Sequence, residues 1–307
     1  MKAVPPTERA PIALFVYNRP GHAVRTVEAL RRNDLAEESD LFVFSDGPKS
    51  SAVREAVASV RESARALSGF RSVTLIERER NLGLAQSIIT GVTELLGRRD
   101  RIIVLEDDMI TSPHFLRFMN EALEFYKDDE RVAGIHAYVY SVGEKLADTF
   151  FLRGADCWGW ATWKRGWDLF EPDGRKLLGE LRSRNLQGEF DKNGAYPYTE
   201  MLEDQIDGKN DSWAVRWYAS TFLRGMLCLH PGRSLVKNIG LDDSGTHCGP
   251  DDLYDVEAAS EPVPVRPIPV EENAGALEAI GRYLKSRRSS RARGFLRRIA
   301  PVKRWLE

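Results

Sequence analysis

The sequence RIIVLEDDM at residues 101–109 places a short apolar run directly before three consecutive carboxylates. Residues 102–105 are apolar and mostly β-branched, which predicts a buried strand. A row of charges cannot continue into a core, so we expect the strand to end where Glu106, Asp107 and Asp108 begin. In open α/β sheets, ligands bind at the carboxyl edge of the strands.

Adjacent carboxylates at such an edge have two interpretations. They form a solvated turn, or they hold a hard divalent cation such as Mg²⁺ or Mn²⁺ through oxygen ligands. A cation bound by a few carboxylates keeps coordination positions free for a diphosphate. The surrounding sequence favours the cation.

Strand and helix patterns alternate over the first 130 residues or so. Apolar runs predict strands at residues 11–17, 40–45, 73–76, 102–105 and 132–136, and amphipathic patterns predict helices at 22–32, 51–67, 84–96 and 113–126. This alternation predicts an α/β fold with a mostly parallel sheet and helices on both faces.

A polar motif follows each of the first four predicted strands. Asn18 and Arg19 follow the first, Asp46 the second, Arg80 and Asn81 the third, and the three acids the fourth. Each motif has a structural alternative, because Asp-Gly-Pro favours a turn and Asn81 can cap a helix. Since parallel strands end at one edge, we expect all four motifs to form a single ligand site.

Residues 158–163 read WGWATW, an unusual concentration of indole rings. Trp158, Trp160 and Trp163 offer flat faces that stack on sugar rings and N–H groups that donate to hydroxyls. The alternative is a local aromatic core beneath a loop.

Two later segments carry candidate catalytic or metal-binding groups. Asp211 precedes a predicted helix and is either a general base facing a cleft or part of a solvated capping loop. His247 lies in the glycine-rich segment 238–249, where it is either structural or able to close over a diphosphate or complete a metal shell.

Composition indicates an ordinary globular protein, with 42% hydrophobic and 29% charged residues in 307. Three widely spaced cysteines give neither a disulfide framework nor a zinc pattern, which favours a reducing compartment. The sequence contains no apolar run long enough to cross a membrane, and residues 1–11 lack the apolar core of a signal peptide. We therefore expect a cytoplasmic protein.

The net charge of −2 conceals a basic tail. Residues 282–307 carry ten Lys or Arg and one acid, which leaves −11 on the rest of the chain. The proline-rich residues before the tail predict an extended linker. The tail is either disordered and solvated or an interfacial helix on anionic lipid. A nucleic-acid partner is disfavoured because the body is acidic.

Together the motifs YNRP, SDGP, ERNLGLAQSIITG and LEDDM, followed by WGWATW and SGTH, resemble the GT-A glycosyltransferases, which use nucleotide sugars. The resemblance spans about residues 11–250 and is nearest to bacterial family 2-like sugar transferases and the inverting N-acetylglucosaminyltransferase I group. It implies a GT-A, Rossmann-like fold in four segments. These are a nucleotide-sugar-binding half (1–140), a Trp-rich acceptor-side half with a lid (141–254), the linker (255–273) and the basic helical tail (274–307).

The resemblance also implies roles for individual residues. Asn18, Arg19, Asp46, Arg80, Asn81, Glu106 and Asp107 would bind the nucleotide sugar, with Asp46 on the nucleobase or ribose. Asp108 would be the direct ligand of Mn²⁺ or Mg²⁺, and His247 would lie in the lid near the diphosphate. Trp158, Trp160 and Trp163 would stack on the acceptor. Asp211 or Asp204 would be the catalytic base, and the two remain rivals.

The expected reaction is a metal-dependent, inverting transfer from a nucleoside diphosphate sugar to a hydroxyl of a saccharide or lipid-linked saccharide. It would serve surface polysaccharide biosynthesis in a bacterium, at the inner face of the plasma membrane. One alternative is a sugar nucleotidyltransferase, although no glycine-rich phosphate loop follows the first strand. Another is a non-enzymatic carbohydrate-binding protein that uses the tryptophans.

Overall fold

The computed structural model describes residues 9–242 and 252–299, with the backbone alone for residue 252 and residues 288–299. The first half contains, in chain order, β1 (Ile12–Val16), α1 (Pro20–Arg31), β2 (Asp40–Ser45), α2 (Arg54–Arg65), β3 (Ser72–Glu77), α3 (Leu84–Leu96), β4 (Arg101–Glu106), β5 (Met109–Thr111), α4 (Phe115–Phe125) and β6 (Val132–His136). The second half contains β7 (Thr149–Arg153), β8 (Trp160–Trp163), α5 (Lys164–Trp167), α6 (Gly174–Ser183), α7 (Gln187–Phe190), α8 (Tyr198–Ile206), α9 (Trp213–Leu223), β9 (Leu227–Pro231), β10 (Val236–Asn238) and α10 (Ala274–Ile299).

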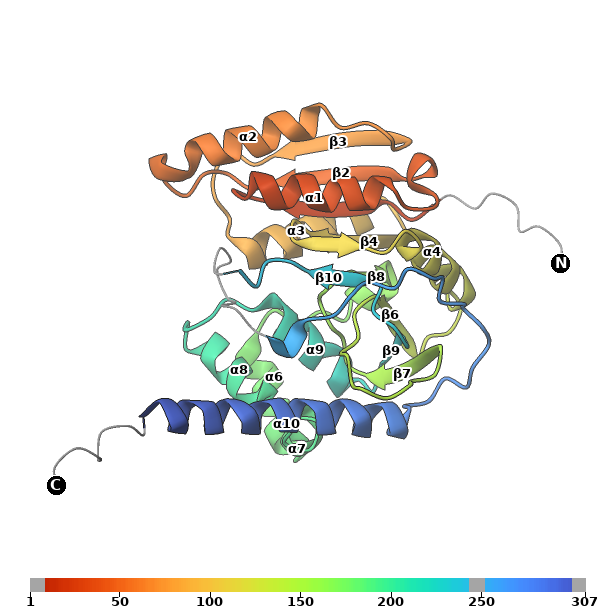
Figure 1. Ribbon diagram of the computed structural model, residues 1–307, viewed down its shortest axis with the longest axis vertical. Helices are drawn as coiled ribbons and strands as arrows, with labels where there is room; N and C mark the ends of the chain where they lie inside the picture. Colours follow the sequence, from red (N-terminus) through yellow and green to blue (C-terminus); the bar gives the residue numbers. More distant parts are fainter. Residues whose placement is uncertain (1–8, 243–251, 300–307) are drawn as a thin grey trace, which may run out of the picture.

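An eight-stranded sheet runs through the molecule in the order β3-β2-β1-β4-β8-β6-β9-β7. Figure 1 shows these strands stacked from β3 at the top to β7 near the bottom. The strands β3, β2, β1 and β4 are parallel, and β6 is parallel to β9. β8 runs antiparallel between β4 and β6, and β7 is an antiparallel edge strand. The predicted α/β fold with a mostly parallel sheet is confirmed.

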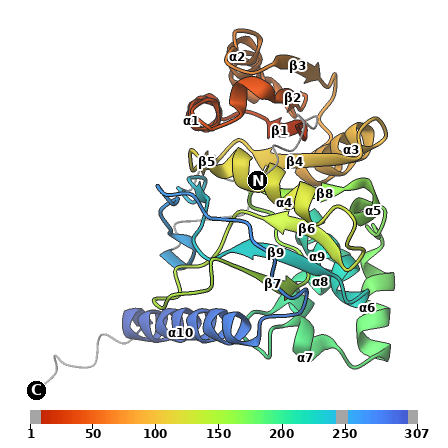
Figure 2. The same cartoon turned by 90° about the vertical axis from the view of Figure 1, so that its right-hand side faces the viewer.

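The strands of the first half are apolar on both sides because both faces of the sheet are covered. In β1, Leu14 points into a core with Val27 of α1, whereas Phe15 points into a second core with Ile88 of α3. Figure 2 shows α1 and α3 on opposite sides of the sheet. Burial on two faces explains why these strands appear in the sequence as continuous apolar runs.

The C-terminal part packs against the body. Residues 255–272 are extended, with Val256 and Val263 buried, and the amide of Ala259 donates to the Ser234 carbonyl at 2.8 Å. α10 then buries Ile280 and Leu284 against the β7 side of the sheet. None of the helices that the structure describes combines the length and the apolar character that crossing a bilayer would need.

Candidate donor-sugar site

The three carboxylates lie where β4 ends and the chain turns sharply. Glu106 is the last residue of β4, Asp107 and Asp108 form the turn, and β5 follows at once. β5 leaves the large sheet and pairs antiparallel with β10. The strand thus ends one residue later than the sequence pattern predicts, with all three acids at the carboxyl edge.

Arg19 holds two of the acids from the start of α1. Its Nη2 donates to Asp107 Oδ1, and to Asp108 Oδ2 at 2.8 Å. The Thr26 hydroxyl donates to the Asp107 carbonyl at 2.8 Å, and the Tyr17 amide donates to the Asp107 carboxylate at 3.4 Å. The YNRP motif and the acidic turn are therefore joined by hydrogen bonds. Arg19, Asp107 and Asp108 lie together, as the sequence predicts.

The turn carries more negative charge than Arg19 neutralises. Burial, together with the charges of Asp108 and Asp107, raises the pKa of Glu106 to about 8. Burial also raises the pKa of Asp107 to about 6, although Arg19 opposes the rise. The Asp108 Oδ1 atom is buried without a hydrogen-bond partner among the described residues. A site with surplus negative charge and an unsatisfied carboxylate oxygen has the chemistry of a cation site.

A divalent cation fits here with few protein ligands. The described residues contain no group of three or more His, Cys, Asp and Glu side chains able to hold a metal ion by themselves. Mg²⁺ and similar cations are commonly held by one or two carboxylates and complete their shell with substrate phosphates and water. Asp108 suits such a role, because its free oxygen is the unsatisfied atom of the turn.

The residues that follow β10 contact Asp108. The amide of Ile239 donates to the Asp108 carbonyl at 2.8 Å, and His22 Nε2 lies 3.2 Å from the Ile239 carbonyl oxygen. A Cβ on Gly240 would lie 2.2 Å from Asp108 Oδ2, so only glycine fits without a shift. His247 lies outside the described residues. Sequence analysis did not single out His22, Thr26 or Gly240, whose importance depends on contacts between distant segments.

The Asp46 carboxylate accepts hydrogen bonds from other parts of the protein. It accepts the Asn81 side-chain amide at 2.9 Å and the backbone amides of Gly47, Leu82 and Gly83 at 2.9–3.1 Å. It therefore holds the loop that begins α3. Asn81 shares this task through a second bond to the Gly47 carbonyl at 2.8 Å. Of this predicted group, Arg80 is exposed and Asn18 half-buried beside the same edge.

The two candidate bases differ in position. Asp211 is exposed just before α9, and its Oδ2 lies 4.0 Å from the place that a Cβ of Gly83 would take. Gly83 is the N-cap residue of α3, so Asp211 reaches the carboxyl edge. Asp204 lies on α8 and pairs with Lys209 at 2.8 Å. Of the two, Asp211 lies beside the start of α3, and its Oδ1 also lies 3.6 Å from the Arg216 guanidinium.

Two of the three tryptophans predicted to stack on a sugar are core residues instead. Trp160 is 1% exposed and Trp163 is 4% exposed, because β8 is a central strand whose two faces are covered. Trp158 precedes β8 and is half-buried, with its ring 4.8 Å from that of Tyr138. Of the three, Trp158 alone has surface left for a ligand.

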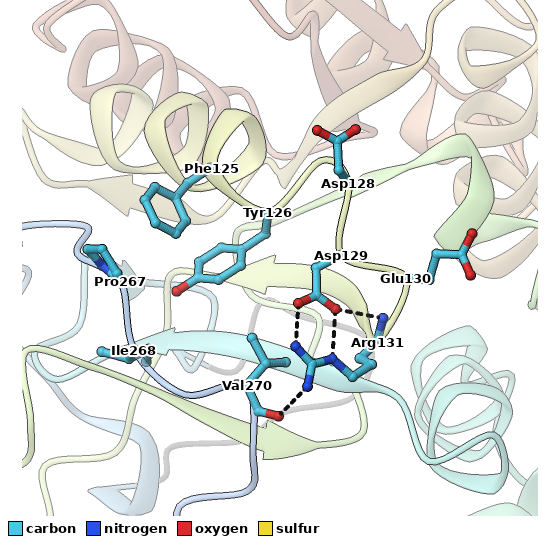
Figure 3. Close-up of a pocket in the computed structure, with 9 residues that line it drawn as sticks. All are labelled: Phe125, Tyr126, Asp128, Asp129, Glu130, Arg131, Pro267, Ile268 and Val270. Carbon is cyan, nitrogen blue, oxygen red and sulfur yellow. Dashed lines mark hydrogen bonds and ion pairs between the residues drawn. The ribbon is translucent and has the colours of Figure 1, made fainter.

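A surface hollow of about 600 Å³ lies elsewhere, between the end of α4 and residues 267–270. Figure 3 shows Asp129 paired with Arg131, which also reaches the Val270 carbonyl. Arg131 immediately precedes β6, so the hollow lies at the amino edge of the sheet, opposite the acidic turn. None of the predicted site residues lines it.

A model described as glycosyl transferase family 2 matches residues 12–175, more than half of the chain, from β1 past β8. The chain belongs to glycosyl transferase family 2. No curated protein matches this family 2 member in sequence.

Solved structures show only distant likeness to this family 2 member. A mannosyltransferase from Pyrobaculum calidifontis, in complex with GDP-Man and Mn²⁺, has 16% identity over 43% of this chain and 36% of its own, with a TM-score of 0.31. TarS from S. aureus has 14% identity over 41% and 21%, with a TM-score of 0.29. A cytidylyltransferase from Leptospira borgpetersenii has 13% identity over 56% and 65%, with a TM-score of 0.34. In each case the match spans less than two thirds of the other protein, and similarity this low carries no argument about activity.

Proposed function

We propose that this protein transfers a sugar from a nucleoside diphosphate sugar to a hydroxyl of a saccharide acceptor, with Mn²⁺ or Mg²⁺ at Asp108. The observation that carries the proposal is the acidic turn at the carboxyl edge, where Asp108 Oδ1 is buried and unsatisfied. When bound there, the cation would neutralise charge on the departing nucleoside diphosphate.

The protein's own residues supply the remaining steps. Glu106 and Asp107 face the donor from the same turn, and Arg19 keeps that turn in shape. Asp211 accepts the proton of the acceptor hydroxyl as it attacks the sugar C1 from the face opposite the diphosphate. A single displacement of this kind inverts the anomeric centre and requires no protein nucleophile.

The proposal extends to a lipid-linked acceptor in surface glycan synthesis. α10 is docked through Ile280 and Leu284, and its backbone continues as a helix through residues 285–299, which carry seven Lys or Arg and no acid. Figure 2 shows this end of α10 projecting beyond the body. A basic helix held away from the protein surface suits contact with the anionic inner face of the plasma membrane, where a lipid-linked saccharide resides.

The test is a thermal-shift screen of nucleotide sugars with and without Mn²⁺. A ligand that binds only the folded state raises the melting temperature, and we expect one nucleoside diphosphate sugar to do so only with the metal. Asp108→Asn should abolish that shift, whereas Asp168→Asn, on an exposed ion pair, should not.

Two outcomes would argue against the proposal. Binding of a nucleoside triphosphate with a sugar 1-phosphate, with release of pyrophosphate, would instead indicate a sugar nucleotidyltransferase. Sugar binding that needs neither nucleotide nor metal, in the absence of any response to nucleotide sugars, would indicate a carbohydrate-binding protein.

A further inference from the structure

A second cluster of ionisable side chains surrounds a narrow cavity in the β9 half of the sheet. The cavity has a volume of about 30 Å³ and lies between the ends of β6, β7 and β9, the helices α8 and α9, and Ile280 of α10. This volume holds roughly two water molecules. The cavity is thus of the right size for hydroxyl groups at the edge of a ligand and too small for a whole sugar ring.

Lys192 and Asp156 bring opposite charges to this cavity without pairing. The Lys192 ammonium lies over the Tyr218 ring at 5.2 Å and makes no hydrogen bond or ion pair with any residue that the structure describes. Asp156 accepts the Cys157 amide at 2.7 Å and forms no ion pair within the described chain. Burial lowers the pKa of Lys192 and raises the pKa of Asp156. Both side chains are half-buried, and opposite charges left apart in a partly desolvated cavity are typical of functional sites.

The cavity also offers uncharged hydrogen-bonding groups. Tyr140 and Tyr198 line it, and neither hydroxyl bonds to a residue within the described ranges. The Lys192 ammonium donates, the Asp156 carboxylate accepts, and the two phenols do both. Arg153 also lines the cavity, but its charge is paired with Glu189. The charges of Lys192 and Asp156 then balance, so the cavity favours a neutral polyhydroxyl ligand over an anion or a cation. Adjacent hydroxyls of a sugar match this set, since one can donate to Asp156 while its neighbour accepts from Lys192.

One end of the cavity lies toward the acidic turn. Val104 pairs with Trp160, and Trp160 pairs with His136 across β4, β8 and β6. Trp158 lies two residues before β8, and its ring contacts that of Tyr138, which lines the cavity. The Tyr138 end of the cavity is therefore two strands from β4, or roughly 10 Å, whereas Arg153 of β7 and His230 of β9 line its far side. An acceptor saccharide that extends from the turn past Trp158 would bring the edge of one sugar to the cavity.

We propose that this cavity is the acceptor subsite, where Lys192 and Asp156 hold adjacent hydroxyls of a neutral sugar. The assignment of the bound sugar as acceptor rests on the proposed transferase function, whereas the binding of the sugar itself does not. Trp158, between the turn and the cavity, would lie along the bound saccharide.

The experiment measures binding of methyl glycosides of neutral hexoses and of glucuronic acid by saturation-transfer NMR, without nucleotide or metal. We expect at least one neutral glycoside to bind the wild-type protein. Lys192→Met and Asp156→Asn should each weaken its affinity about tenfold or more, because each removes a hydrogen bond to a charged group. Asp156→Asn retains an oxygen for the Cys157 amide, and melting curves would verify that both variants fold.

Lys164→Met and Asp168→Asn, which alter an exposed pair at 2.7 Å, serve as matched controls and should leave affinity unchanged. Equal binding by all variants, binding of the glucuronoside alone, or no binding of any glycoside to the wild type would overturn the proposal. The thermal-shift response to nucleotide sugars is measured separately. If it is absent while glycoside binding depends on Lys192 and Asp156, the cavity remains a sugar site and the transferase function fails.

Discussion

Arg19 shows how one residue can stabilise a crowded acidic turn. Its guanidinium bonds to both Asp107 and Asp108, residues that lie almost ninety positions later in the sequence. Burial disfavours its charge, but the two carboxylates outweigh this and raise the pKa of Arg19. The guanidinium occupies the space beside Asp108 that a cation would also seek. Arg19 and a divalent cation therefore compete for the negative charge of the same carboxylate, Arg19 at Asp108 Oδ2 and the cation at Oδ1.

This competition gives a prediction for Arg19→Met. Loss of the guanidinium leaves Glu106, Asp107 and Asp108 without a positive neighbour, so the free protein should bind Mn²⁺ about tenfold more tightly. Titration calorimetry without nucleotide measures the change directly. Arg25→Met, on an exposed part of α1, is the matched control and should not alter affinity. Unchanged or weaker Mn²⁺ binding by Arg19→Met would show that the guanidinium does not compete.

The rival bases can be separated at the same scale. Asp211→Asn should lower kcat by a factor of about 10²–10⁴ and leave nucleotide-sugar binding intact, because besides proton acceptance it removes only the charge facing Arg216 at 3.6 Å. Asp204→Asn should change kcat by less than about threefold, since Asp204 is held by Lys209 on α8 and its loss affects one exposed ion pair. Steady-state kinetics on both variants decide between them, and the reverse ranking would transfer the role to Asp204.

At the scale of elements, the first half was predictable from sequence because local pattern and tertiary position agree. Helix α3 begins and ends at the residues that its apolar spacing indicates. The polar motifs follow the strands as predicted, and the strands are parallel, so the motifs share one edge. The bonds from Asp46 to residues 81–83 were not predictable, because a carboxylate after a strand bonds equally well to a ligand or to a loop. The nucleotide-binding role of Asp46 stays a prediction.

The second half was less predictable because tertiary contacts determine its elements. WGWATW lacks a strand-like alternation, yet Trp160–Trp163 forms β8 in the middle of the sheet. Its burial comes from β4 and β6 on its two sides and from α9, whose Trp213 and Trp217 pack on Trp160. The proline-rich segment 255–272 is extended, as its composition indicates, but the composition could not show that it packs on the body.

α10 has two parts with different expected functions. Removal of residues 287–307 eliminates eight Lys or Arg and leaves the docked residues Ile280 and Leu284 in place. A chain ending at Ser286 should therefore bind anionic vesicles at least roughly a hundredfold more weakly, since each basic residue near the surface contributes about 1 kcal/mol. Co-sedimentation with phosphatidylglycerol vesicles at low and high salt measures this.

Ile280→Ala tests the docked part of α10 instead of its basic part. It should lower the free energy of unfolding by about 2–4 kcal/mol because it removes most of a buried apolar side chain, while vesicle binding persists. The chain ending at Ser286 should keep its stability. Equal vesicle binding by the shortened chain and the full chain would refute a membrane function for the basic residues.

At the scale of the whole molecule, the acidic turn and the polar cavity lie in different parts of one sheet. The four parallel strands β3, β2, β1 and β4 bring the turn to their carboxyl edge, whereas the cavity lies beside β6, β9 and β7, where Arg153 of β7 pairs with the first residue of β9. Both sites bury ionisable groups, so both affect global stability as well as ligand binding. The cavity offers the clearer measurement, because His230, which lines it, packs against Phe150 and His136 and not against the acidic turn.

His230 should make the stability of the whole fold sensitive to acid. Burial, together with the charge of Lys192, lowers its pKa to about 3, even though a bond to the Tyr138 backbone opposes the shift. Its other neighbours are Phe150 and the buried His136, which is also held neutral. Between pH 6.5 and pH 3, His230 is protonated in the unfolded chain and stays neutral in the folded protein. The free energy of unfolding must therefore fall as pH falls through this range.

Between pH 7 and pH 4, His230 should lower the free energy of unfolding by about 3 kcal/mol, because each pH unit below 6.5 contributes about 1.4 kcal/mol. Urea denaturation across that range compares the wild type with His230→Asn, which cannot titrate. The variant is less stable at pH 7 through altered packing, so the informative quantity is the slope with pH, which should be shallower in the variant. Other acids titrate in both proteins and cancel in the comparison. Parallel slopes would mean that His230 is protonated in the folded state, with the cavity more open to water than its tyrosines and α10 allow.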